Sequence, residues 1–227
     1  MKKRTAFVGL ILSLIPIGQP LLIKTGVFLS SSALLLSFPE EVNGESSAFY
    51  FDRAFEKGNK GDHYGAISDF SKVIEMEPNN SKAFYNRGWN KGNLKDYYGE
   101  ISDYNKAIEI NPKYTNAYYN RGLAKRFLED YYGAISDYNK AIELDPKFEN
   151  AYINRGIAKR NIEDYYGAIS DYNKAIEIDP MDKDSYINRS IAKENIGDIK
   201  GACLDAKKAI SLGDRASENQ KWIKKNC

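Results

Sequence analysis

The sequence predicts an all-α repeat protein, and three observations support this fold class. Residues 47–216 divide into five segments of 34 residues with no gap between them. The third and fourth segments are identical at 26 of 34 positions, which excludes chance similarity. Each segment contains two apolar runs at helical spacing, separated by a short polar turn. Such a period indicates helix pairs that stack into one array. The segments are 47–80, 81–114, 115–148, 149–182 and 183–216.

The third segment shows how each unit is expected to fold. Apolar residues near helical spacing predict a first helix from Ala117 to about Leu128. Asp130 lies where an N-cap is needed for a second helix, which extends to about Leu144. Pro146 then stops that helix, because proline disfavours helical geometry in the residue before it. Three other segments carry the same stop, as Pro78, Pro112 and Pro180.

The fifth segment ends differently, in Leu212-Gly213-Asp214 without a proline. Residues 217–227 follow it and place Trp222 and Ile223 among several lysines. The last pair of a stacked array leaves an apolar surface uncovered. We therefore expect residues 217–227 to form a capping helix.

The first 44 residues do not share the repeat. Three basic residues open the chain, the mostly apolar residues 6–38 follow, and Val42 and Gly44 suit the small positions before a cleavage site. This pattern is typical of an export signal. A retained anchor is the alternative, because residues 6–23 supply 18 mostly apolar positions, about the minimum that spans hydrocarbon. Residues 6–38 could then associate with a membrane. Both interpretations predict a protein that is exported, to the periplasm or another extracytoplasmic compartment, or membrane-anchored.

Composition excludes several function classes. The 33 Lys and Arg nearly balance the 31 Asp and Glu, so no nucleic-acid partner is expected. One histidine and two cysteines leave too few ligands for a zinc site, and we expect no metal and no cofactor. The chain has neither a phosphate loop nor a nucleophile–histidine set, so it is expected to be no enzyme, with no small-molecule substrate. His63 stands where other segments have tyrosine and is expected to be a packing residue.

The repeat resembles the tetratricopeptide repeat family. The third segment matches that family's pattern through its period and through Gly122, Ala134, Tyr138, Ala141 and Pro146. The resemblance covers residues 47–216. It implies a right-handed α-solenoid of five helix pairs with a concave groove. It also implies a non-enzymatic scaffold that binds a protein or peptide.

The resemblance further implies which residues contact a ligand, because the family's ligands usually meet certain places of the first helices. An asparagine ladder lies there, and an amide that both donates and accepts can hold an extended backbone of any sequence. An apolar wall and three cations surround it, so we expect a segment with apolar anchors and some acidic character. Alternatively, these asparagines only satisfy neighbouring backbone groups and the aromatic residues only pack. The ladder is Asn86, Asn120, Asn154 and Asn188; the wall is Tyr85, Trp89, Tyr119, Leu123, Phe127, Ile153 and Ile157; the cations are Lys82, Arg126 and Arg160.

One variety of the family, the carboxylate clamp that holds chaperone C-termini, is excluded. Its pattern needs Lys and Asn at the fifth and ninth places of one repeat. Here the second segment has Tyr85 and Trp89 at those places, and the third has Tyr119 and Leu123.

Two charged places recur in all five segments. Arginine occupies the seventh place and aspartate the twenty-third, and an antiparallel helix pair brings these places to about the same height. We therefore expect an ion pair inside each repeat, with the planar guanidinium gripping the carboxylate through two bonds. The pairs are Arg53/Asp69, Arg87/Asp103, Arg121/Asp137, Arg155/Asp171 and Arg189/Asp205.

Two further features depart from the pattern. Glu100 stands where the other four segments have alanine. A buried carboxylate is costly, so Glu100 is expected to reach solvent, pair with a cation or loosen the second repeat. Antiparallel packing would bring Cys203 and Cys227 together, and an exported protein tolerates a disulfide. The sequence leaves open whether they are bonded or are two separate thiols.

The leading hypothesis is a protein-binding scaffold in the assembly or export of a membrane or envelope complex. Two alternatives stay open. A single-stranded RNA-binding helical repeat would need a basic groove with aromatic residues for stacking. A self-associating structural array is favoured by the near-identity of the third and fourth segments.

Overall fold

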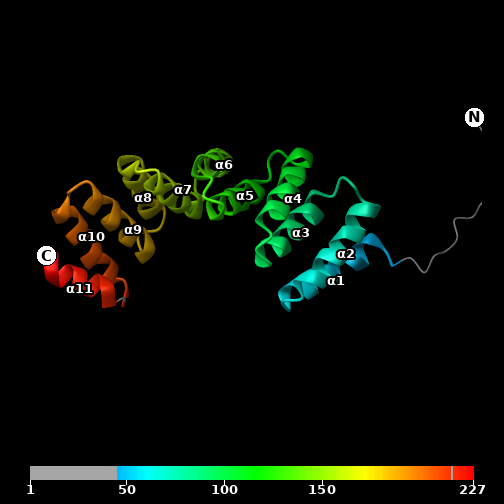
Figure 1. Ribbon diagram of the computed structural model, residues 1–227, viewed down its shortest axis with the longest axis horizontal. Helices are drawn as coiled ribbons and strands as arrows, with labels where there is room; N and C mark the ends of the chain where they lie inside the picture. Colours follow the sequence, from blue (N-terminus) through cyan, green and yellow to red (C-terminus); the bar gives the residue numbers. More distant parts are fainter. Residues whose placement is uncertain (1–44, 216) are drawn as a thin grey trace, which may run out of the picture. The chain divides into compact units, whose positions relative to one another are not determined.

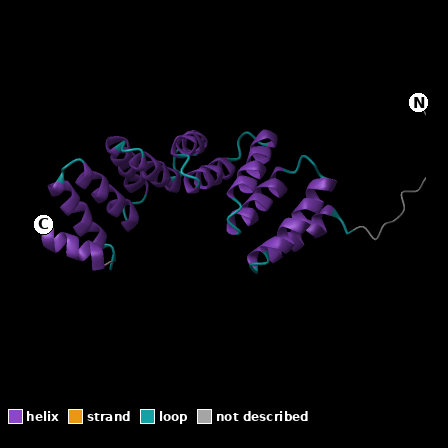
Figure 2. Ribbon diagram, in the orientation of Figure 1, coloured by secondary structure: helices purple, strands orange, loops and turns teal. Residues whose placement is uncertain are grey.

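The computed structural model describes residues 45–215 and 217–227, so the signal or anchor expected in residues 1–44 lies outside the described residues. Within the described part, the chain is helical with short turns and has no strand (Figure 1, Figure 2). No helix in that part is long and apolar enough to cross a membrane. The helices are α1 (Ser47–Asn59), α2 (His63–Met76), α3 (Ser81–Asn93), α4 (Tyr97–Ile110), α5 (Thr115–Phe127), α6 (Tyr131–Leu144), α7 (Glu149–Asn161), α8 (Tyr165–Ile178), α9 (Lys183–Asn195), α10 (Ile199–Ser211) and α11 (Ser217–Asn226).

The helices follow one another as stacked pairs. Each odd-numbered helix from α1 to α9 packs against the next helix in the chain, and each pair packs only on its neighbours (Figure 1). The first helices of adjacent pairs also contact one another, whereas the second helices do not. The first helices are therefore closer together and form the inner side of the stack, which we call the inner face. This arrangement confirms the predicted all-α solenoid of helix pairs.

Each second helix begins at an aspartate cap, as the sequence predicts for Asp130. The Asp130 carboxylate accepts a hydrogen bond of 2.9 Å from the backbone N–H of Gly133. Glycine is required there, because a Cβ on Gly133 would collide with the capping carboxylate. The same Asx cap begins the other second helices, at Asp62, Asp96, Asp164 and Asp198.

The turn before each cap needs a residue in the left-handed region. Gly61 and Gly197 supply it in the first and fifth pairs, with φ of 84° and 80°. Lys95, Glu129 and Glu163 adopt φ of 62–64° in the other three, a conformation that costs a residue with a Cβ about 1 kcal/mol. Lys95, Glu129 and Glu163 are therefore turn residues between the two helices of their pairs.

The boundaries of the third pair differ slightly from the prediction. Helix α6 ends at Leu144 as predicted, but α5 begins at Thr115, two residues before Ala117, and ends at Phe127. The earlier start has a physical reason. The carbonyl of Tyr114 already accepts from the N–H of Ala117 at 2.9 Å, so the first turn closes without a side-chain cap.

The core of each pair places a small residue under a large aromatic ring. Tyr138 is completely buried, and a Cβ on Gly122 would lie 2.7 Å from its ring. Gly156 and Tyr172 repeat this contact at 2.6 Å in the next pair. Only glycine therefore lets α5 and α7 approach their partners this closely.

The predicted ion pair is present in all five repeats. Arg155 donates two bonds to Asp171, from Nε at 3.0 Å and from Nη2 at 2.6 Å. Two further contacts were not predicted. Lys159, one turn along α7, donates to the same carboxylate at 2.9 Å, and Arg155 Nη1 donates to Asn139 of the preceding repeat at 2.7 Å. The arginine thus links its own repeat to the one before it.

The last helix closes the C-terminal end of the stack. Helix α11 packs on α10, and the sulfurs of Cys203 and Cys227 are bonded, with their Cα atoms 5.8 Å apart. The indole N–H of Trp222 donates to Glu194 on α9 at 2.8 Å. Helix α11 is therefore held to both helices of the fifth pair.

Candidate binding face

The inner face keeps three large aromatic side chains exposed. Phe55 on α1 is 53% exposed, Trp89 on α3 is 40% and Phe127 on α5 is 57%. Exposed aromatic side chains that gather on one surface indicate a place where another molecule binds. Trp89 lies between two hollows on this face, one on each side.

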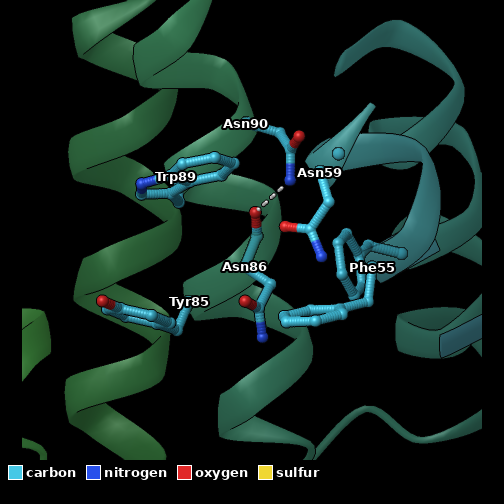
Figure 3. Close-up of a pocket in the computed structure, with 8 residues that line it drawn as sticks. Phe55, Asn59, Tyr85, Asn86, Trp89 and Asn90 are labelled. Carbon is cyan, nitrogen blue, oxygen red and sulfur yellow. Dashed lines mark hydrogen bonds between the residues drawn. The ribbon is translucent and has the colours of Figure 1, made fainter. Parts of the chain in front are cut away.

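The first hollow lies between α1 and α3 and is called the Phe55 hollow. It has a volume of about 140 Å³. Figure 3 shows Tyr85, Asn86 and Trp89 on α3 facing Phe55 and Asn59 of the neighbouring helix. The residues that line it are Phe55, Gly58, Asn59, Phe70, Tyr85, Asn86, Trp89 and Asn90.

Hydrogen bonds of one buried residue, Asn90, fix part of the wall of the Phe55 hollow. Asn90, which is almost completely buried, donates from Nδ2 to the carbonyl of Asn86 at 2.8 Å (Figure 3). Its side-chain oxygen lies 2.9 Å from Nδ1 of His63, and the His63 ring packs edge-on against Trp89. His63 therefore packs as expected, and it also helps to hold Asn90 and Trp89 in place.

The second hollow lies between α3 and α4 on one side and α5 on the other, and is called the Glu100 hollow. It has a volume of about 300 Å³. One wall is aromatic, because the rings of Tyr97 and Phe127 stack with centroids 5.2 Å apart. The residues that line it are Trp89, Gly92, Asn93, Lys95, Tyr97, Glu100, Tyr104, Asn120, Leu123, Ala124 and Phe127.

Two of the three outcomes expected for Glu100 are wrong, and the third, a loosened second repeat, stays a prediction. Its side chain neither reaches solvent nor pairs with a cation: the residue is 8% exposed and forms no ion pair with the described residues. Gly92 makes room for it, because a Cβ there would lie 2.6 Å from the Glu100 carboxyl. The other repeats have alanine in place of Glu100, and in the third and fourth an arginine stands where this one has Gly92. The first repeat also has glycine at this place, as Gly58, so only Glu100 is peculiar to the second repeat, and Gly92 gives its carboxyl room between α3 and α4.

The carboxyl of Glu100 is hard to ionise where it lies. Burial raises its pKa to about 7, the nearby Tyr104 hydroxyl opposes part of that rise, and the charge of Asp96 adds to it. The Tyr104 hydroxyl is itself buried and makes no hydrogen bond of normal geometry with the described residues. Glu100 and Tyr104 thus place two buried polar groups close to one another in the wall of one hollow.

The asparagine ladder is partly engaged within the chain. Asn86 donates to the carbonyl of Lys82 at 2.8 Å, and Asn188 donates to that of Asp184 at 2.9 Å. Asn120 donates to the hydroxyl of Tyr85 at 2.8 Å. Asn154 makes the equivalent bond to Tyr119 at 3.1 Å, so these two amides link adjacent repeats.

The predicted site residues do not all come together. Tyr85, Asn86 and Trp89 line the Phe55 hollow, and Asn120 and Leu123 join Trp89 in the Glu100 hollow. Tyr119 packs against Phe148, with ring centroids 4.7 Å apart. Phe127 also lines the Glu100 hollow. The other predicted residues line neither hollow: Asn154, Asn188, Ile153, Ile157, Lys82, Arg126 and Arg160.

The predicted cations are also partly engaged. The Arg126 guanidinium lies 5.1 Å from the ring centroid of Phe127, and its Nε is buried without a hydrogen-bond partner among the described residues. Arg160 lies within 3.5 Å of the side-chain oxygen of Asn188. Sequence reasoning missed Phe55, Asn59, Tyr97 and Glu100 as lining residues. For Phe55 a signal existed, since it occupies the same ninth place as Trp89 and Leu123.

A stack of antiparallel helix pairs with a hollowed inner face defines a helical-repeat interaction scaffold. The tetratricopeptide repeat model matches residues 81–114, 115–148 and 149–182, which coincide with the second, third and fourth segments. Residues 81–182 are therefore tetratricopeptide repeats, a fold that typically serves as a protein–protein interaction scaffold and not as an enzyme.

Solved structures show the same fold. A crystal structure of MamA protein is 26% identical to this chain, covers 76% of it and 94% of the MamA chain, and gives a TM-score of 0.70. MamA from Desulfovibrio magneticus RS-1 is 20% identical, with 77% and 98% covered and a TM-score of 0.72. YrrB, a TPR protein with an unusual peptide-binding site, is 19% identical, with 79% and 92% covered and a TM-score of 0.70. A comparison with curated protein sequences finds no match.

Proposed function

We propose that this protein binds an extended or helical segment of a protein partner on its inner face. The observation that carries the proposal is the set of exposed aromatic side chains beside two hollows, Phe55, Trp89 and Phe127. Buried aromatic anchors supply much of the binding energy in protein interfaces. On this surface they can be covered by apolar side chains of a bound segment.

The asparagine ladder can take part in binding although its amide nitrogens are engaged. The side-chain oxygens of Asn86, Asn120 and Asn154 accept no hydrogen bond from the described residues. Each such oxygen can accept a backbone N–H from a bound segment. The internal bonds fix the orientation of each amide beforehand, which reduces the entropy lost when a segment binds.

We also propose that the protein works outside the cytoplasm or at a membrane, in the assembly or export of a membrane or envelope complex. The basic start, the apolar residues 6–38 and the Cys203–Cys227 bond support this location, because disulfides persist in oxidising compartments. Mass spectrometry of the protein from its native cells tests it. A mature chain that begins near residue 45 and resists alkylation at both cysteines is expected for an exported protein. A full-length chain alkylated at both would contradict export.

The binding proposal is tested by cross-linked capture from native cells with three full-length proteins. The wild type is compared with an Asn120→Ala/Asn154→Ala variant on the inner face. The matched control is Tyr98→Ala/Tyr132→Ala, whose tyrosines are 77% and 74% exposed but begin the second helices and line neither hollow. A partner recovered with the wild type and the control, and lost with the asparagine variant, supports binding on the inner face.

Other outcomes point to the alternatives. Equal recovery with all three proteins would refute the inner face as the binding site. Recovery of RNA that weakens steeply with added salt would favour the nucleic-acid alternative. A mass that grows with protein concentration in light scattering, without any partner, would favour a self-associating array.

A further inference from the structure

The Glu100 hollow differs chemically from the rest of the inner face. Its volume is about 300 Å³, and it joins the exposed Trp89 ring to the stacked pair of Tyr97 and Phe127. Glu100, which is 8% exposed, lines it without any ion pair to the described residues. A carboxylate walled by aromatic rings is a suitable environment for a cation, because the faces of the rings also attract positive charge.

From this juxtaposition we propose that the Glu100 hollow is a subsite for one basic side chain, lysine or arginine, of the bound segment. The inference rests on the proposed function and adds a residue of defined charge to the ligand. The ammonium or guanidinium group would lie against the Glu100 carboxylate, and its aliphatic stem would pack on Trp89 and Phe127. Such a stem can lie along apolar surface while its charged end reaches a counter-ion.

Neither Lys91 nor Lys95 supplies the cation for this subsite, because neither forms an ion pair with Glu100 in the described part of the chain. Lys91 on α3 donates to Asp103 at 2.7 Å and is thereby engaged in the repeat's own ion pair. Lys95 lines the same hollow but lies in the turn after α3, with its backbone in the left-handed region, and it makes no ion pair with the described residues. Asp96 adds negative charge from the start of α4.

Position in the repeat supports the same assignment. The equivalent residue is alanine in the other four repeats, so a carboxyl at this place is not needed for the fold. Gly92 leaves room for this carboxyl, since a Cβ there would lie 2.6 Å from it. The buried Tyr104 hydroxyl has no partner of normal geometry and lines the hollow beside it. A bound cation would give both groups an electrostatic partner.

The proposal makes a quantitative prediction about pH. A cation binds the ionised form of Glu100, whose pKa burial raises to about 7. The ionised fraction, and with it the affinity for a cation, rises about tenfold between pH 6 and pH 8. The titratable groups around Glu100 are Tyr104 and Asp96 on α4, at its start in the case of Asp96, and Lys95 in the lining of the hollow. Burial raises the pKa of Tyr104 further above its ordinary value, so its hydroxyl stays neutral in this range.

The test is an NMR titration of the full-length protein with n-butylammonium chloride, followed at the indole N–H of Trp89. n-Butanol is the neutral match, n-propylguanidinium chloride represents arginine, and sodium chloride keeps the ionic strength constant. The variants are Glu100→Gln, which keeps shape but not charge, and Glu109→Gln as control. Glu109 lies on the same helix, is exposed and pairs only with Lys106. The wild type and Glu109→Gln are expected to bind butylammonium about tenfold more tightly at pH 8 than at pH 6.

Glu100→Gln is expected to lose that binding at both pH values while keeping its fold. Butanol that binds as well as butylammonium, or Glu100→Gln that binds butylammonium like the wild type, would overturn the subsite. The titration needs no partner protein. If the titration shows no binding but partner capture still depends on Asn120 and Asn154, only the subsite is refuted. If butylammonium binds but partner capture is the same for the wild type and the asparagine variant, only the proposed function is refuted.

Discussion

At the scale of single residues, the charged cluster in each repeat is the most regular polar feature of this protein. The buried Asp137 receives two bonds from Arg121 and one of 2.8 Å from Lys125, and the cluster recurs in every repeat. Removing one member of a buried charged group leaves the others without a counter-charge. The aspartate is the most sensitive member, because it is 3% exposed while both cations are partly hydrated.

Asp137→Ala should therefore lower the free energy of unfolding by about 3 kcal/mol, as expected for an uncompensated buried charge. Chemical denaturation measures this loss. The control is Glu143→Ala on the same helix, which removes an exposed pair with Lys140 and should cost less than about 0.5 kcal/mol. Equal losses for the two variants would mean that the buried cluster is no more stabilising than a surface pair.

Removing the Glu100 carboxyl, in contrast to removing Asp137, is expected to stabilise the protein at high pH. Its pKa lies near 4.5 in the unfolded chain and is raised to about 7 by burial in the folded one. Between these values the folded protein keeps a proton that the unfolded chain releases, so stability falls as the pH rises through this window. Above pH 7 the full cost of burying the charge applies, up to about 3 kcal/mol.

Glu100→Ala should therefore raise Tm by a few degrees at pH 8 and by much less at pH 5. Thermal unfolding at the two pH values measures the difference. Glu109→Ala, an exposed change on the same helix, should show no such dependence. An equal gain at both pH values would show that packing rather than charge causes it, and no gain at pH 8 would contradict a stability cost in the second repeat.

At the scale of helices, one glycine of α3, Gly92, makes room for the Glu100 side chain of α4. A Cβ on Gly92 would lie 2.6 Å from the Glu100 carboxyl, so alanine there displaces a buried group. Without the carboxyl, the same change should be favourable, because alanine stabilises a helix relative to glycine by about 0.5–1 kcal/mol.

A double-mutant cycle tests this coupling. Gly92→Ala should be neutral or destabilising in the wild type and stabilising by about 0.5–1 kcal/mol in a Glu100→Ala background. Denaturant unfolding of the four proteins measures the interaction energy. Identical effects of Gly92→Ala in both backgrounds would show that α3 and α4 are not coupled at this point.

At the scale of the whole array, stability is expected to be local to neighbouring repeats. Each pair packs only on the pairs beside it, and bonds such as Arg155 to Asn139 link adjacent repeats. In such an array the stability of each repeat depends on its contacts with the adjacent repeats. The bond between Cys203 and Cys227 ties the last helix to α10 and should act mainly on the C-terminal end.

Reduction with dithiothreitol, or Cys227→Ser, should speed hydrogen exchange in α11 and α10 and leave α3 to α6 unchanged. Closing a loop of this length is worth at most about 3.5 kcal/mol in the chain-entropy account. Exchange followed by mass spectrometry measures the effect helix by helix. Uniform acceleration along the array would show that the bond stabilises all repeats together. No acceleration in α11 would show that packing on α9 and α10 suffices.

Features that depend on short-range chemistry could be predicted from the sequence. The aspartate caps, the proline stops and the Arg–Asp pairs each follow from residue types at a fixed spacing within one unit, and the structure contains them. The repeat itself implied stacking, because a lone helix pair cannot bury its apolar face. The start of α5 was predicted two residues late because its first turn closes through backbone bonds alone, which leave no mark on side-chain pattern.

The candidate site could be predicted only in part. Trp89 and Asn120 were assigned to the inner face from their places in the repeat, and both line the Glu100 hollow. The internal bonds of Asn120 and Asn154 to tyrosines of the preceding repeat were not assigned, because they depend on how closely one pair approaches the next. The sequence left open whether Glu100 is buried, because the space that Gly92 leaves for its carboxyl lies on a different helix.

The sequence by itself thus determined the helices, their pairing and the charged cluster that recurs in every repeat, because each depends on contacts within one 34-residue unit or on its exact repetition. Only the tertiary structure decided where the inner face is hollow and which polar groups are buried there without an ion pair to the described residues. Those properties depend on the distance and angle between neighbouring pairs, which are set by many side chains at once. The buried Glu100 carboxyl, which shares a hollow with Trp89 and forms no ion pair with the described residues, is the clearest product of that packing.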